Sequence, residues 1–177
     1  MKRQWTADLK IELMRPTQEN LKESTGKVRK AMQRALSRGM TLGASYVRKD
    51  LKVALDKALE SKTWNWPNVT LRQNGETVRS PRNIVDTGKL KASLAFRERT
   101  FVTKTTIEII YKTPYAAIVH YGGKIRPYGD KRRDPVFIPG RPWVMAVFRG
   151  THGIDKFDIR TPYEKGVLER WQGQFGK

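Results

Sequence analysis

Residues 84–123 read IVDTGKLKASLAFRERTFVTKTTIEIIYKTPYAAIVHYGG, and this stretch predicts the core of the fold. Asp86 has a short carboxylate that can accept backbone N–H bonds two or three residues on, as an N-cap or an Asx-turn does. At Gly88 the backbone can bend sharply, because glycine has no Cβ. Leu90 and Leu94 are four residues apart, which is the spacing of one short helical turn. We therefore expect a capped turn that leads into a strand.

The middle of the stretch has the alternating pattern of two β-strands. Residue character alternates over 94–97 and again over 106–111, which is typical of strands with one buried face. The pattern predicts an antiparallel pair joined near Val102–Lys104. Apolar residues then follow helical spacing, so we expect a short apolar helix over Pro114–Tyr121 with proline at its start. The glycine pair Gly122–Gly123 ends it.

Three motifs in this order resemble a family of tailed-phage neck and tail-completion proteins, often described as minor tail components. They are VDTGKLKASL, PYAAIVHYGG and GRPWVMAV. The family pattern is a hydrophobic-Asp-Thr-Gly-basic-Leu-x-x-Ser turn, a Tyr-Ala-x-x-(Val/Leu)-(Glu/His)-(Phe/Tyr)-Gly segment and an Arg-Pro-(Phe/Trp) start of a helix. The residues that match are Asp86, Thr87, Gly88, Leu90, Ser93, Tyr115, Ala116, His120, Gly122, Arg141, Pro142 and Trp143.

The resemblance covers residues 84–148 and a long N-terminal helix. It implies a structural protein of the virion, placed in the neck or tail region and made in the host cytoplasm. It further implies a closed ring of six or twelve identical copies that joins head to tail and lets DNA pass. The partners it implies are adjacent neck, connector, tail-terminator or tail-tube proteins, together with genomic DNA touched through non-specific contacts. The chain departs from the pattern in the tryptophan-containing connector before Ser80 and in a basic insertion between Gly123 and Arg141.

The 177 residues fit a single domain, 1–177, that is long enough to bury its own core. The chain has no cysteine, which excludes disulfides and thiol chemistry and suits a reducing cytoplasm. No apolar run approaches the length of a membrane span, so we expect a soluble protein with no membrane partner.

The N-terminal part begins with alternating residues that predict a strand of the central sheet, ended by Pro16. From there the apolar spacing becomes helical, and it predicts a helix over Thr17–Lys62 with Thr17 as its cap. A single helix of that length would be roughly 65–70 Å long. The alternative is two shorter helices folded as a hairpin near Arg38–Gly43, where glycines weaken the helix.

A long connector follows over residues 61–82, with a small hairpin expected at Asn74–Gly75. Its tryptophans are Trp64 and Trp66. They could be exposed anchors for another protein, but we favour the alternative that they close the edge of a core.

The segment over residues 124–140 reads as an extended basic loop or arm. Its cations are candidates for contact with DNA or an acidic partner: Lys124, Arg126, Lys131, Arg132 and Arg133. The competing reading is a solvated turn in which Asp130 and Asp134 are the local partners.

Toward the C-terminus the sequence predicts a short strand over Val136–Ile138 and a helix from Arg141–Pro142–Trp143 to Phe148. A last amphipathic helix is expected from a cap and proline at Thr161–Pro162 to Trp171. Together these elements predict an α+β fold, with a long N-terminal helix packed on a mainly antiparallel sheet and short C-terminal helices.

The charge balance of 36 Lys+Arg against 17 Asp+Glu gives a net charge of +19. Such an excess favours a polyanion or an acidic protein as partner. No motif for sequence-specific recognition is present, so the alternative to a virion protein is a basic protein that binds nucleic acid through phosphates.

Enzymatic signals are few. Asp86–Thr87–Gly88 also matches the way an aspartic protease presents its catalytic carboxylate, and a homodimer would supply the second one. Lys89 and Lys91 follow where that family has small or acidic residues, so this reading ranks third. His120 is expected to be packed in the core. We predict no catalytic residue, no metal site and no cofactor.

Overall fold

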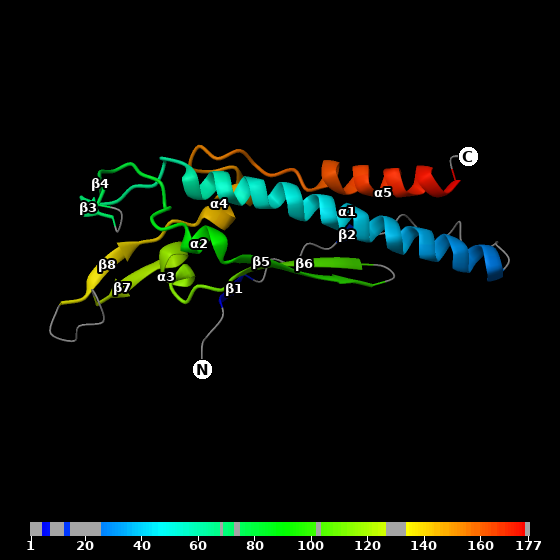
Figure 1. Cartoon of the computed structure of the whole chain (residues 1–177), viewed down its shortest axis with the longest axis horizontal. Helices are drawn as coiled ribbons and strands as arrows, with labels where there is room; N and C mark the ends of the chain where they lie inside the picture. The colour runs from blue at the N-terminus through cyan, green and yellow to red at the C-terminus, as the bar shows by residue number, and fades with distance from the viewer. Residues whose placement is uncertain are drawn as a thin grey trace. The chain divides into compact units, whose positions relative to one another are not determined.

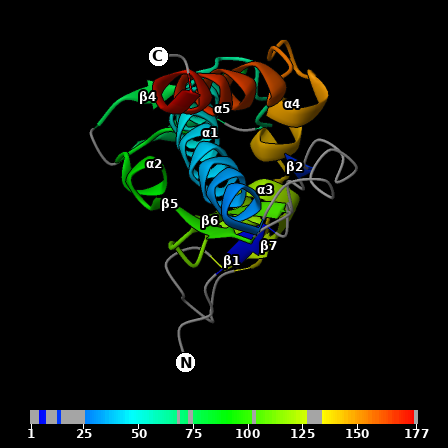
Figure 2. The ribbon, with the colours of Figure 1, turned by 90° about the vertical axis from the view of Figure 1, so that its right-hand side faces the viewer.

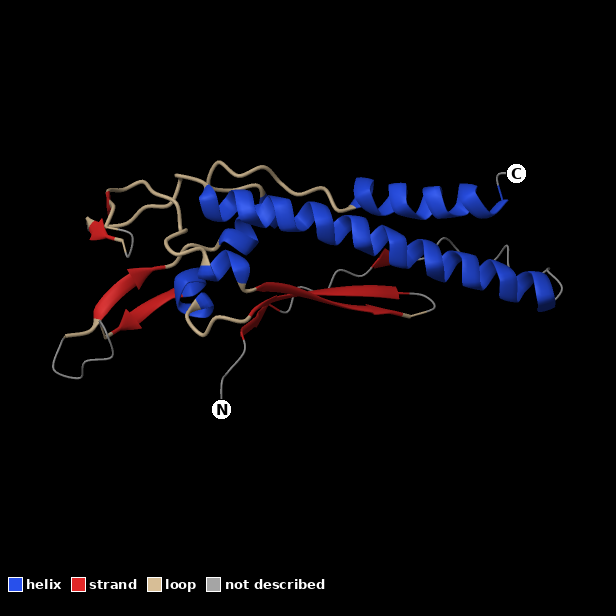
Figure 3. Cartoon of the chain, viewed as in Figure 1, coloured by secondary structure: helices blue, strands red, loops and turns tan. Residues whose placement is uncertain are grey.

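A computed structural model describes residues 5–7, 13–14, 26–67, 69–72, 75–101, 104–126 and 134–175. The fold is mixed α+β, as predicted, with a long N-terminal helix packed on small antiparallel sheets and short helices toward the C-terminus (Figures 1 and 3). The chain divides into two compact units. The first holds residues 1–6, 53–95 and 110–157, and the second holds residues 7–52, 96–109 and 158–177. The expectation of a single domain stays a prediction.

Helix α1 (Gly26–Glu60) runs for 35 residues without a break. Its buried face repeats at steps of three and four and includes Ala44, Val47, Leu51 and Leu55, all with no exposed surface. The alternative of a hairpin near Arg38–Gly43 was therefore wrong. The predicted start at Thr17 lies outside the described residues, and the helix ends two residues before Lys62.

Within the second unit, helix α5 (Arg160–Phe175) packs along α1. A Cβ built on Gly166 would lie 2.6 Å from the Cα of Gly43, so the two backbones touch where both residues are glycine. Three residues further along each helix, the Tyr46 hydroxyl donates a 2.6 Å hydrogen bond to Glu169. Figure 2 shows α1 between α5 and the strands β5 and β6. The glycines that weaken α1 in isolation are thus the positions that admit a second helix.

The start of α5 differs from the prediction of Thr161–Pro162 by one residue. The carboxylate of Asp158 accepts the backbone N–H of Arg160 at 2.9 Å and also accepts the hydroxyl of Thr161. These bonds satisfy donors of the first helical turn, so the helix begins at Arg160.

The central sheet is built around β6 (Lys104–Tyr111), which pairs with β5 (Leu94–Thr100). Phe101 and Lys104 exchange backbone hydrogen bonds at the end of this hairpin, where the sequence predicts the turn. Strands β1 (Trp5–Ala7) and β2 (Leu13–Met14) also pair with β6, and Leu13 lies opposite Thr105. The N-terminal residues therefore join the sheet as predicted, in two short strands.

The first unit adds two small hairpins. Strand β3 (Thr70–Leu71) pairs with β4 (Thr77–Val78), which confirms the hairpin expected in the connector. Strand β7 (Gly122–Ile125) pairs with β8 (Val136–Pro139) in register from Gly122 opposite Pro139 to Ile125 opposite Val136. The prediction of an extended loop over residues 124–140 was therefore wrong at its start, where Lys124 and Ile125 belong to β7. The short strand predicted over Val136–Ile138 is confirmed as β8 (Val136–Pro139). The glycine pair does end a helix, but it also begins a strand.

Three short helices complete this unit: α2 (Lys89–Ala92), α3 (Ala116–Tyr121) and α4 (Trp143–Arg149). All three lie where the sequence predicts a helical turn or helix, within two residues at each end. Pro142 is the N-cap of α4, one position earlier than expected. Trp143 is fully buried, and its Nε1 donates a 3.0 Å hydrogen bond to the hydroxyl of Tyr111. Burial raises the pKa of that Tyr111 hydroxyl well above its usual value, so it stays protonated.

Candidate functional site

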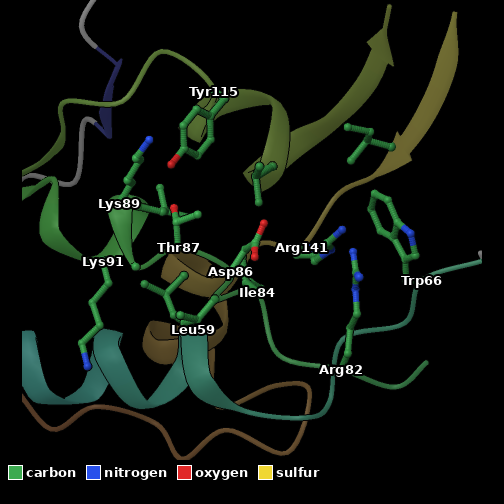
Figure 4. A pocket seen from close by; sticks show the side chains of 15 residues that line it. Leu59, Trp66, Arg82, Ile84, Asp86, Thr87, Lys89, Lys91, Tyr115 and Arg141 are labelled. Atoms are coloured by element: carbon green, nitrogen blue, oxygen red, sulfur yellow. The ribbon is translucent and has the colours of Figure 1, made fainter. Parts of the chain in front are cut away.

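Three motifs that lie apart in the sequence meet at one pocket of the first unit (Figure 4). The pocket has a volume of about 390 Å³. Its lining includes residues 86–90 of the first motif, Tyr115 of the second and Arg141 of the third. The end of α1 contributes Leu59, and the connector contributes Trp66 and Arg82.

Backbone hydrogen bonds bring the motifs together. The carbonyl of Ser93, at the end of the first motif, accepts the N–H of Lys112 at 3.1 Å, just before the second motif begins. The carbonyl of Val119, inside the second motif, accepts the N–H of Arg141 at 3.0 Å. Ile84 donates to the carbonyl of Leu59 at 2.8 Å and so fixes the first motif to the end of α1. The pocket is therefore part of the folded core of this unit.

The predicted motif residues divide into two groups. Asp86, Thr87, Gly88, Leu90, Tyr115 and Arg141 line the pocket. The other six lie outside the lining. The Ser93 hydroxyl donates to the carbonyl of Leu90 at 2.8 Å, Gly122 has a φ of 81° where α3 passes into β7, Ala116 and His120 are buried in α3, and Pro142 and Trp143 lie at the start of α4.

Asp86 does not have the predicted role of helix cap. The N-cap of α2 is Gly88, whose φ of 74° is left-handed, and no side-chain hydrogen bond caps this helix. Asp86 is exposed, and Figure 4 shows its carboxylate directed into the pocket. Burial and the Asp86 charge together raise the pKa of Tyr115, whose ring lines the same pocket. An Asx-turn at Asp86 stays a prediction.

Two arginines dominate the pocket. Arg82 and Arg141 are 8% and 5% exposed, and their guanidinium carbons lie 4.7 Å and 4.0 Å from the ring centre of Trp66. Arg141 is held by its place before α4, and Arg82 by a pair of backbone hydrogen bonds with Trp64. Figure 4 shows both side chains at the end of the pocket that Trp66 closes.

Both guanidinium groups are poorly compensated. Burial, and the neighbouring charge of Arg82, lower the pKa of Arg141 to about 10. Burial and the charge of Arg72 lower the pKa of Arg82, while Asp86 acts in the opposite direction. The buried Nε of each arginine has no hydrogen-bond partner in the described structure. Buried charges are normally paired, so this arrangement is one that a bound anion would complete.

The two lysines of the first motif have different surroundings. Lys91 is paired with acidic residues near the end of α1, at 2.6 Å from Glu60 and 3.7 Å from Asp56. The hydrogen bond with Glu60 raises the pKa of Lys91 and keeps it charged. Lys89 is exposed at the rim of the pocket. The pocket is therefore cationic at Arg82 and Arg141, whereas the charge of Lys91 is compensated.

The predicted basic arm is described only in part. Lys124 and Arg126 are exposed at the end of β7, and Lys131, Arg132 and Arg133 lie outside the described residues. On the paired strand, Phe137 is 61% exposed and lines a second, shallower hollow with Trp66, Pro67 and Pro139. Trp66 borders both hollows.

Nothing in the sequence singled out Arg82. Trp66 was read either as an anchor for another protein or as the edge of a core. Trp64 is 2% exposed and its Nε1 donates to the carbonyl of Ala58 at 2.8 Å, so the reading as the edge of a core is confirmed for this residue. Trp66 instead supports the arginines. Arg82 follows Pro81 in an aperiodic connector, where no local pattern marks it.

The remaining chemical candidates are structural. His120 is buried, as predicted, with its ring 4.7 Å from that of Trp143, and burial lowers its pKa to about 4. No group of acidic residues, histidines or cysteines in the described part of the chain has the arrangement of a metal site. Among the described residues that line the pocket, Asp86 is the only carboxylate. None of the described helices is both long and apolar enough to cross a membrane.

Comparisons with protein-family models, with curated proteins and with solved structures found no match to this chain.

Proposed function

We propose that this chain is a structural protein of a tailed-phage virion, a subunit of the neck or tail-completion ring that joins head to tail and lets DNA pass. The observation that carries the proposal is the convergence of the three motifs on one pocket. Residues of all three motifs, spread over positions 86–141, line the same pocket. A pocket with buried, poorly compensated cations is better suited to receiving another molecule than to filling a core.

A ring of copies is consistent with the proportions of the chain. Helix α1 is about three times the mean length of a helix in globular proteins. Its first turns present Arg29, Lys30, Arg34 and Arg38 as exposed cations. Closed rings form when one surface of a subunit binds a different surface of the next. Six or twelve copies, with neck, connector, tail-terminator or tail-tube proteins as neighbours, remain part of the proposal.

A second candidate function rests on the charge. The net charge of +19 and the exposed cations of α1 favour a basic protein that binds nucleic acid without sequence preference. In a ring through which DNA passes, the two functions are compatible. They differ in whether the protein becomes part of the particle.

The test is to delete the gene from a phage that encodes this chain and to image the products. The proposal expects DNA-filled heads and complete tails that stay unjoined, and joining restored when the chain is supplied from a plasmid. It also expects a reconstruction of the intact particle to show a ring of this chain at the head–tail junction or in the tail. Normal particles without the chain would overturn the virion function and leave the nucleic-acid alternative.

A further inference from the structure

Arg82 and Arg141 are two buried, poorly compensated cations in one pocket of the first unit. Both guanidiniums lie over the ring of Trp66, and the only carboxylate among the described residues of the pocket is that of Asp86, which acts on the charge of Arg82. Both side chains are more than nine-tenths buried, and the Nε of each has no hydrogen-bond partner among the described residues. Cation–π contact with tryptophan offsets part of the cost of burial, but it satisfies no N–H donor.

Two buried like charges side by side favour a bound anion. Each arginine presents a planar fork of donors that matches a carboxylate or a phosphate. A fully apolar pocket of this volume would need neither arginine, and a surface site would leave both hydrated. Asp86 offsets part of the charge of Arg82, but the buried Nε–H donors of both arginines have no acceptor among the described residues.

The walls of the pocket favour a peptide carboxylate over a DNA phosphate. Leu59, Ile84, Val85, Leu90 and other apolar side chains make up most of the remaining lining. A duplex presents its phosphates on a wide convex surface, whereas these guanidiniums lie in a recess. The carboxylate of Asp86 also faces the pocket, but it repels a phosphate and a peptide carboxylate alike and so does not distinguish them. An acidic side chain next to an apolar one would fit both the cations and the apolar wall.

We propose that Arg82 and Arg141 form an anion site that binds an aspartate or glutamate carboxylate of an acidic, partly apolar peptide segment from a partner protein. The inference deepens the proposed assembly function, on which the choice of a protein partner rests. The carboxylate accepts hydrogen bonds from both guanidiniums. The neighbouring apolar side chain of the segment occupies the part of the pocket lined by Leu59 and Leu90.

The test uses the full chain and four probes: an acetylated hexapeptide with two glutamates between leucines, the same peptide with glutamines, inorganic phosphate and a short DNA duplex. Binding is measured by calorimetry and by the NMR signals of the arginine Nε–H groups. The variants are Arg82→Gln and Arg141→Gln, and the matched control is Arg79→Gln, an exposed arginine of the same connector.

We expect the glutamate peptide to bind and to shift the Nε–H signals of Arg82 and Arg141, and the glutamine peptide to leave them in place. Each pocket variant should weaken binding of the glutamate peptide about ten-fold or more, because a hydrogen bond to a charged group is lost. Arg79→Gln should stay within about two-fold, as expected for a surface charge.

Several results would overturn the carboxylate site. One is a glutamate peptide that shifts neither Nε–H signal of the wild-type chain, a readout that does not depend on any variant folding. Another is phosphate or duplex DNA that binds with the same dependence on Arg82 and Arg141 while the peptide does not, which would assign the pocket to nucleic acid. Neither result bears on the gene deletion, so the virion function and the carboxylate site stand or fall separately.

Discussion

Replacing Gly166 with alanine tests the contact between helices α1 and α5. The new Cβ would lie 2.6 Å from both Cα and N of Gly43 and 2.9 Å from the carbonyl carbon of Leu42. Non-bonded carbons are most stable at about 3.5–4.0 Å, so α5 must move by about 1 Å. The atoms it meets are backbone atoms of a helix, which cannot turn away as a side chain does.

The expected cost follows from two opposing effects. Overpacking of this kind costs about 1–3 kcal/mol, and a clash with backbone belongs at the upper end. Alanine regains up to about 1 kcal/mol over glycine within a helix. Gly166→Ala should therefore lower the free energy of unfolding by about 2 kcal/mol. For a chain of this size that corresponds to a fall in Tm of about 4–8 °C.

Gly173→Ala is the matched control, because it lies in the same helix and a Cβ there meets nothing within 4 Å. It should raise the free energy of unfolding by about 0.5 kcal/mol, through helix propensity alone. Thermal and urea unfolding followed by far-UV circular dichroism measure both variants. The reasoning is refuted if Gly166→Ala is as stable as the wild type, or if the two alanines shift Tm in the same direction.

Three further predictions concern charge. Arg141→Met should stabilise the free chain by about 1 kcal/mol at pH 7, because a buried cation is replaced by an apolar side chain of similar length; a clear fall in Tm would contradict this. Because the pKa of Arg141 is lowered to about 10, its buried charge destabilises the folded state at pH values below 10. This destabilisation is relieved only as the pH rises above that value. His120, with a folded pKa of about 4 against 6.5, favours folding while it is neutral, so its contribution is lost as the pH falls from 6.5 toward 4. Between pH 7 and pH 5 the free energy of unfolding, measured with urea, should fall by about 1–2 kcal/mol less for His120→Gln than for the wild type. Equal falls in the two proteins would refute the assignment. Binding of the chain to duplex DNA should be indifferent to sequence and should weaken steeply with salt; strong preference for one sequence at physiological salt, measured by competition, would favour the nucleic-acid alternative over the virion function.

The sequence by itself determined the elements that depend on neighbours a few residues away. Alternation over 94–97 and 106–111 predicted the β5–β6 hairpin, and helical spacing predicted α1 and α3, whereas the proline at Pro142 predicted the start of α4. These patterns are reliable because one buried face imposes a period of two on a strand and 3.6 on a helix. The first residues were likewise placed in the sheet, although as one strand where the structure has β1 and β2.

Only the tertiary structure decided what happens between segments far apart in the chain. Glycines in α1 suggested a break, but the structure keeps the helix continuous through Gly43, where the missing side chain leaves room for Gly166 of α5. Asp86 had the local signature of a cap, yet Gly88 occupies that position. No local sequence pattern marked Arg82. Trp66 and Arg141 come near it only because Trp64 pairs with Arg82 within the connector and α3 accepts a hydrogen bond from Arg141, just before α4. Local spacing determines which face of an element is buried, whereas the pocket depends on which elements then cover one another, and that is settled by packing across the whole unit.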